Sequence, residues 1–215
     1  MTRQSPVLRA HLLKMTMLTQ RAVDHSIKAY ELRSLELCGL VHPSDRQWCA
    51  VQRAIGNRGR RLLAAGLAVD TESLLARCTV RMYSALRTTY TAATEIAHNS
   101  LMLAEGAQAD ASEPIKRMGQ LVNGLVRQCT VALFKGEPGH AEAILRDDAG
   151  RQWFERTLGH TEVDLLRRGG AQSRLELAIA RSLGQIAEQV YEMAETLKSC
   201  MHGSDSPTLL RNRAA

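Results

Sequence analysis

Two pairs of side chains have the types and spacing that could place metal ligands on one face of a helix. Glu95 and His98 stand three residues apart, and Glu188 and Glu192 stand four apart. Because residues three or four apart lie on the same side of an α-helix, each pair could turn its side chains toward one cation. A di-iron bundle, however, needs two Glu-x-x-His pairs and two further glutamates. We therefore predict no complete metal site and keep these four residues as candidate ligands; the alternative is a solvated helix face.

A basic run at residues 57–61, followed by Arg77, Arg81 and Arg87, could offer positive charge to a phosphate group or a nucleic acid. The alternative is that these side chains line a solvated face of a helical bundle. Neither a helix-turn-helix pattern nor interleaved aromatic residues accompany the run, so the sequence predicts no specific nucleic-acid binding. The net charge of +6 is compatible with anionic partners but is too small to identify one.

The sequence contains none of the common catalytic motifs. It has no glycine-rich phosphate loop, no Gly-x-Ser-x-Gly elbow and no His-Glu-x-x-His zinc motif. Long helices joined by short turns would also offer few loops on which to build an active site. We therefore predict that the protein is not an enzyme.

The composition favours helices. Of the 215 residues, 45% are hydrophobic and 23% are charged, but only 4% are aromatic. A β-sandwich or barrel of this length would use more aromatic and β-branched residues, and more turns built on glycine and proline. The predicted fold class is therefore all-α.

The five cysteines are an odd number and include no Cys-x-x-Cys pair, so they indicate neither a secreted disulfide framework nor a zinc ribbon. A reducing cytoplasm is the simpler interpretation. Basic residues interrupt the apolar positions near the N-terminus, and no apolar run approaches the length of about 18 residues that a membrane span needs. We expect a soluble cytoplasmic protein that meets a membrane only through a partner.

Prolines, glycines and capping residues divide the chain into six predicted helices. Proline is tolerated in the first turn of a helix, and glycine often ends one. The last helix is predicted to begin with a capping box formed by Ser173 and Glu176. The six helices cover about residues 6–40, 43–66, 70–104, 112–135, 138–169 and 173–201.

Apolar residues within the helices repeat in steps of three and four, which is typical of the buried seam of a bundle. Short turns between such helices imply antiparallel neighbours. In the last helix the seam consists of Ile179, Leu183, Ile186, Val190, Met193 and Leu197.

The six helices fall into two similar sets of three, on either side of a polar linker at residues 106–112. The tripeptide Arg-Gln-Trp ends at Trp48 in the first set and recurs ending at Trp153 in the second, and we expect both tryptophans to pack in the bundles. The sequence predicts an internal duplication, with the division as follows: a first three-helix bundle at 1–106, a second at 112–203 and a flexible tail at 204–215.

The segment at residues 132–148, ALFKGEPGHAEAILRDD, is similar to a segment of the PhoU family of bacterial phosphate-signalling regulators, and the resemblance extends over about residues 12–203. It implies two tandem antiparallel three-helix bundles. It further implies a cytoplasmic, homodimeric adaptor in phosphate homeostasis. The implied partners are the ATPase of a phosphate ABC transporter or a sensor histidine kinase, whose signalling it would restrain when phosphate is ample.

The resemblance also implies iron or zinc, held by a Glu-x-x-x-Asp motif on the third helix of each bundle. At the first motif this sequence has Arg87 and Thr91 in place of the two acids, and at the second only Glu188 is acidic. Glu95, Glu188 and Glu192 all lie within about one helical turn of the motif positions. No cofactor is therefore firmly predicted.

Two other kinds of function remain open from the sequence. One is a metal-binding helical-bundle protein, and the other is a structural or nucleic-acid-associated helical scaffold. Bound metal would support the first, and strongly salt-dependent binding to DNA would support the second.

Overall fold

The computed structural model describes residues 4–42, 45–64, 71–106 and 110–202, with side chains described for 7–42, 45–57, 78–106 and 110–200. These residues form eight helices and no strand, as the predicted fold class requires. No helix among them is long and apolar enough to cross a membrane. The helices are α1 (Gln4–Leu32), α2 (Leu35–Gly39), α3 (Arg46–Ala64), α4 (Thr71–Gly106), α5 (Glu113–Lys135), α6 (Pro138–Arg146), α7 (Asp148–Arg168) and α8 (Gly170–His202).

Several helix ends lie where capping residues predict them. Asp45 Oδ1 accepts hydrogen bonds from the backbone N–H groups of Gln47 and Trp48, at 2.7 and 3.0 Å, at the start of α3. A proline occupies the first turn of both α5 and α6. Gly136 ends α5 in the left-handed conformation, with φ of 65°. The predicted start at Pro43, the end at Gly66 and the tail at 204–215 lie outside the described residues.

The first predicted helix, at 6–40, is wrong in one respect, because the structure divides it into α1 and α2. Arg33 between them has φ of 50°, a left-handed conformation that stops a helix. Ser34 then caps α2, its hydroxyl accepting a hydrogen bond from the N–H of Leu37 at 3.3 Å. The chain therefore bends near residue 33 without glycine or proline.

The fifth predicted helix, at 138–169, is also divided, here into α6 and α7. Asp147 lies at the break, and its Oδ1 accepts a hydrogen bond from the N–H of Gly150 at 2.9 Å. α8 begins at Gly170, so the predicted capping box is wrong. The helix already starts at the turn formed by Gly169 and Gly170, so Ser173 and Glu176 lie inside it. Both residues are buried.

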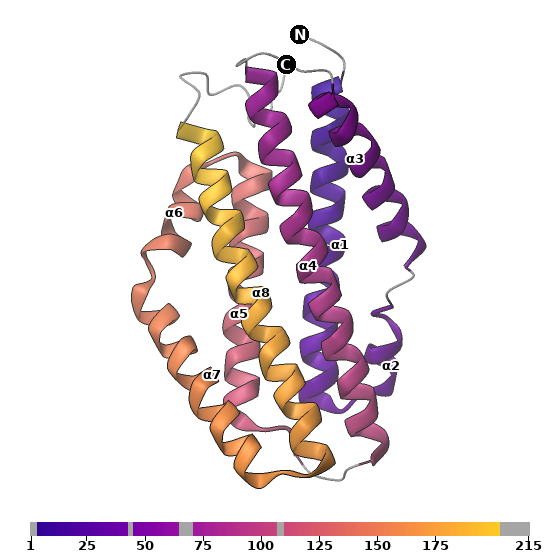
Figure 1. The fold of residues 1–215 in the computed structure, drawn as a ribbon, viewed down its shortest axis with the longest axis vertical. Coiled ribbons are helices and arrows are strands. Elements are labelled where there is room, and N and C mark those ends of the chain that lie inside the picture. Colours follow the sequence, from indigo (N-terminus) through magenta and orange to yellow (C-terminus); the bar gives the residue numbers. More distant parts are fainter. Residues whose placement is uncertain (1–3, 43–44, 65–70, 107–109, 203–215) are drawn as a thin grey trace.

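The two halves lie side by side along their length (Figure 1). α1, α4, α5 and α8 pack against one another in the middle of the molecule. α2 and α3 flank them on one side, and α6 and α7 on the other. Each half therefore contributes two central helices and one flanking segment, as expected for two three-helix bundles. The residue boundaries of the two predicted domains stay a prediction.

One buried core runs through both halves. All six predicted seam residues of α8 are buried, which confirms the seam. α1 and α5 approach so closely that a Cβ atom on Gly119 would lie 2.9 Å from Ile27 Cγ2. Burial of each large apolar side chain contributes about 1.5–3 kcal/mol, so this shared core holds the halves together.

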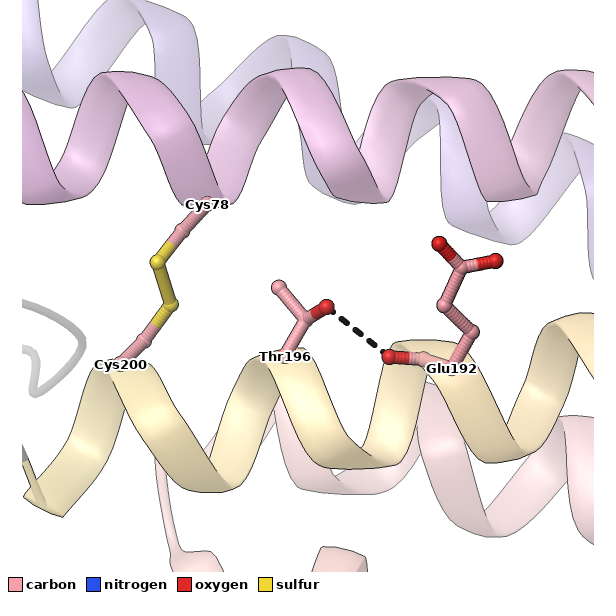
Figure 2. Close-up of a disulfide and its surroundings, with 4 residues drawn as sticks. All are labelled: Cys78, Glu192, Thr196 and Cys200. Carbon is pink, nitrogen blue, oxygen red and sulfur yellow. Dashed lines mark hydrogen bonds between the residues drawn. A yellow bond between two sulfur atoms is a disulfide. The ribbon is translucent and has the colours of Figure 1, made fainter.

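A disulfide between Cys78 of α4 and Cys200 of α8 also joins the two halves (Figure 2). No sequence pattern pairs these cysteines, which are 122 residues apart in the chain. Their Cα atoms lie 6.5 Å apart because α4 and α8 are antiparallel neighbours.

Candidate functional site

A shallow groove of about 550 Å³ lies between α4 and α8, and Glu95 of α4 is one of its walls. The rest of the lining comes from one side of α8, where residues three or four positions apart share a face. These residues are Arg174, Leu177, Ala178, Arg181, Ser182 and Gln185. The groove is therefore built by both halves of the molecule.

A hydrogen bond crosses the groove between the two halves. The hydroxyl of Ser182 donates it to Oε2 of Glu95, at 3.1 Å. Ser182 is buried and Glu95 is exposed, so the carboxylate reaches over the edge of α4 toward a fixed hydroxyl. Glu95 thus has a partner on α8 that the sequence did not reveal.

Arg181 links the groove to the flanking helix α7. Its Nε lies 2.9 Å from Oε1 of Glu162, in an ion pair that is well exposed to solvent. Exposed ion pairs contribute at most about 1 kcal/mol, so Arg181 could exchange Glu162 for a carboxylate of another molecule at little cost.

The α8 side of the groove carries two exposed basic residues. Arg174 and Arg181 are both exposed and stand seven residues apart, which places them about two turns apart on the same side of α8. Two guanidinium groups at this spacing could each receive a carboxylate. The lining contains no histidine or cysteine.

No protein-family model and no curated protein matches the sequence. Two solved structures are similar over nearly the whole chain. PhoU from Pseudomonas aeruginosa has a TM-score of 0.81 at 19% identity, and the match covers 94% of this chain and 98% of that one. The phosphate transport system regulatory protein PhoU from Streptococcus pneumoniae has a TM-score of 0.74 at 20% identity, covering 95% and 96%. This chain has the PhoU fold. The predicted resemblance is confirmed at the level of the fold.

On this PhoU fold, the four candidate metal ligands are all exposed, with Glu95 and His98 on α4 and Glu188 and Glu192 on α8. Among the described residues, no three side chains of His, Cys, Asp or Glu come together as a metal site would require. Glu95 is bonded to Ser182 instead. The donors of the described residues therefore do not fit the multinuclear iron or zinc site that the resemblance implies.

The basic run is only partly described. Arg81 and Arg87 lie exposed on α4. The side chains of residues 58–61 and of Arg77 lie outside the described residues. The predicted phosphate-contacting or nucleic-acid-contacting surface therefore stays a hypothesis.

A buried polar cluster at the junction of the halves escaped the sequence analysis. Oε1 of Glu176 lies 3.4 Å from both the Tyr30 hydroxyl and Nη2 of Arg33. The same hydroxyl accepts a hydrogen bond from the N–H of Ser112, at 2.9 Å, just before α5. The guanidinium of Arg33 lies over the ring of Tyr30, 4.8 Å from its centre. The cluster therefore ties α1, α5 and α8 together.

Glu176 did carry a sequence signal. It stands three residues before Ile179, in register with the buried seam of α8. Burial raises the pKa of the Tyr30 hydroxyl, and the negative charge of Glu176 raises this pKa further. Tyr30 therefore stays protonated at neutral pH and can donate to Glu176.

A second polar contact joins the halves at the solvent edge of α1 and α5. The two oxygens of Asp24 accept hydrogen bonds from Lys28 at 2.8 Å, from Asn123 at 2.8 Å and from Arg127 at 2.9 Å. Burial acts to raise the pKa of Asp24, but the hydrogen bonds from these three side chains and the charge of Lys28 outweigh it. The pKa of Asp24 is therefore lowered below its ordinary value.

Proposed function

We propose that the protein is a cytoplasmic regulator of phosphate uptake or phosphate signalling. It would act as an adaptor that binds the ATPase of a phosphate ABC transporter or a sensor histidine kinase. The observation that carries this proposal is the match of the whole chain, both halves included, to PhoU structures, one of them named as a phosphate transport system regulatory protein. Fold alone does not fix function, so surface chemistry must support the proposal.

The surface supports an adaptor more than an enzyme. The groove between α4 and α8 is open and basic on its α8 side, which suits an acidic segment of a partner. The flanking helix α7 exposes three large apolar residues, Trp153, Val163 and Leu166, close to the helix that forms the groove. Exposed aromatic and aliphatic side chains beside charged groups are typical contact residues of protein partners.

In this proposal the adaptor restrains the activity of its partner by steric and allosteric effects. A partner held on the groove and on α7 would contact both halves, because Glu95 comes from the first half and all other lining residues from the second. A shift of one half against the other would then change the affinity for the partner. We also propose that the protein is a homodimer, which sedimentation equilibrium would test.

Binding measurements with purified partners test the proposal. The full-length protein is titrated with the ATPase subunit of the phosphate transporter, and separately with the cytoplasmic part of the sensor kinase, both from the same organism. Saturable binding to one of them is expected. Replacing both groove arginines, Arg174→Glu and Arg181→Glu, should weaken it at least tenfold.

The control variant is Arg117→Glu on α5, an exposed arginine paired with Glu113, which lies away from the groove. This variant should bind the partner as the wild type does. No binding to either partner would overturn the proposal. Binding that both variants weaken equally would reject the groove as the contact site.

A further inference from the structure

The disulfide between Cys78 and Cys200 fastens the beginning of α4 to the end of α8, and so connects the two halves covalently (Figure 2). In Figure 2 the bridge spans the space between the two helices, and Thr196 and Glu192 follow Cys200 along α8 toward the middle of the molecule. The hydroxyl of Thr196 bonds to the backbone oxygen of Glu192 within its own helix, at 2.9 Å, and so makes no link to α4.

The bridge lies beyond the last described buried apolar side chains of α4 and α8. Among the described side chains, Met82 and Leu197 are the last buried apolar residues of these helices toward this end, each 2% exposed. Cys78 and Cys200 lie beyond them and are both partly exposed. In the described part of the interface, the disulfide thus lies beyond the last buried apolar side chains, on two residues that are partly exposed.

The other described cysteines have a different chemistry. Cys38 and Cys129 are buried, and burial raises the pKa of both thiols, that of Cys129 to about 12. Only a thiolate attacks a disulfide, so burial makes these two thiols poor nucleophiles. Cys49 on α3 is partly exposed, as Cys78 and Cys200 are, and therefore serves as a control cysteine of similar exposure.

We propose that Cys78 and Cys200 form a reversible redox lock between the two halves. In a reducing cytoplasm, protein disulfides are usually transient and redox-sensing, so the inference rests on the proposed cytoplasmic function for its setting. With the bridge formed, the ends of α4 and α8 are fastened together. With the bridge reduced, these helix ends can separate. Their separation would change the shape of the surface that a partner contacts.

The oxidant in this proposal is a small-molecule disulfide of the glutathione class. The thiolate of one cysteine attacks it, forming a mixed disulfide and releasing one thiolate. The second cysteine attacks the protein sulfur of the mixed disulfide, closes the bridge and releases the second thiolate. The two protein thiols lose two protons and two electrons, and the small disulfide becomes two thiols. Excess small-molecule thiol runs the same steps in reverse.

The direct test is a titration of the purified full-length protein in buffers with a varied ratio of reduced to oxidised glutathione. Free thiols are alkylated, and the linked peptides that contain Cys78 and Cys200 are quantified by mass spectrometry. The proposal predicts that the bridge opens in the native protein when reduced glutathione is in excess and closes again when oxidised glutathione is added. A bridge that opens only after unfolding, or never forms, would overturn it.

A second set of measurements tests whether the bridge stabilises the ends of α4 and α8. Reduction should lower Tm by about 5–15 °C, because the bridge closes a long loop. It should also speed hydrogen exchange at least tenfold in residues 78–82 and 196–200. Cys78→Ser and Cys200→Ser should match the reduced wild type in both redox states, whereas Cys49→Ser should keep the full shift.

Equal Tm and equal exchange in the two redox states would reject a lock even if the bridge is reversible. The titration uses this protein alone, so it can succeed when binding to phosphate-system partners fails, and the reverse. Repeating the partner titration in both redox states then shows whether the lock regulates binding.

Discussion

The two halves share one plan but hold their flanking helices differently. In the first half, Trp48 of α3 is 4% exposed and stacks on Tyr90 of α4, with ring centres 4.2 Å apart. In the second half, Trp153 of α7 ends the same tripeptide but is 39% exposed. An identical sequence motif therefore anchors one flanking helix in the core and leaves the other with an aromatic residue on the surface.

The two tryptophans also occupy different places in their helices. Trp48 is the third residue of α3, whereas Trp153 is the sixth residue of α7, because the cap at Asp147 starts that helix earlier relative to the motif. Phe154 occupies the buried position of α7 instead. Neighbouring residues of a helix point about 100° apart, so α7 turns Phe154 toward the core and leaves Trp153 near the surface.

The largest expected effect separates the two tryptophans. Trp48→Ala should lower the free energy of unfolding by about 3–5 kcal/mol, because it removes a buried aromatic stack. Trp153→Ala should change it by less than about 0.5 kcal/mol. Urea denaturation of both variants measures the difference. Similar losses in the two variants would contradict the contrast between the halves.

The next effect concerns the junction between the halves. Glu176→Ala should lower the free energy of unfolding by about 3 kcal/mol, because it leaves the guanidinium of Arg33 and the hydroxyl of Tyr30 without their buried partner. Glu176→Gln, which keeps the shape, should lose less. If Glu176→Ala is as stable as the wild type in urea, the cluster does not tie the halves together.

A smaller, pH-dependent effect is expected at Asp24. Its pKa is lowered in the folded protein, so its contribution to stability is complete above the unfolded value of about 4. The contribution is lost as the pH falls below 4, through the lowered folded pKa. Asp24→Asn should cost about 1 kcal/mol at neutral pH and should flatten the acid limb of the stability curve. An unchanged acid limb would rule out Asp24 as its source.

The smallest effect on stability is expected at the groove. Arg181→Gln breaks only the exposed ion pair with Glu162 and should cost at most about 1 kcal/mol. Its effect on partner binding should exceed its effect on stability. Thermal unfolding and titration of the same preparation separate the two, and a variant that loses stability but not binding would remove Arg181 from the contact surface.

Much of the fold could be predicted because its signals are local. Pro114, Pro138 and Gly136 mark helix ends through their own backbone restrictions, and the seam of α8 follows from helical spacing. The breaks at Arg33 and Asp147 were missed, since neither residue type demands a turn. An arginine adopts φ of 50° only when the surrounding structure holds it there.

The candidate site was less predictable because its contacts are distant in sequence. Glu95 was singled out for its spacing from His98, but its observed partner is Ser182, 87 positions further along the chain. Cys78 and Cys200 are 122 residues apart, and only the antiparallel packing of α4 on α8 brings them together. Local patterns specify helices, whereas pairing across the two halves depends on the completed fold.

Phosphate uptake by cells of the source organism that lack this protein would test the proposed regulatory role. In these cells uptake should stay high when phosphate is ample. The wild-type chain should lower uptake again, whereas the variant carrying Arg174→Glu and Arg181→Glu should not. Uptake that responds to phosphate equally well with and without the protein would contradict a role as a phosphate-system regulator.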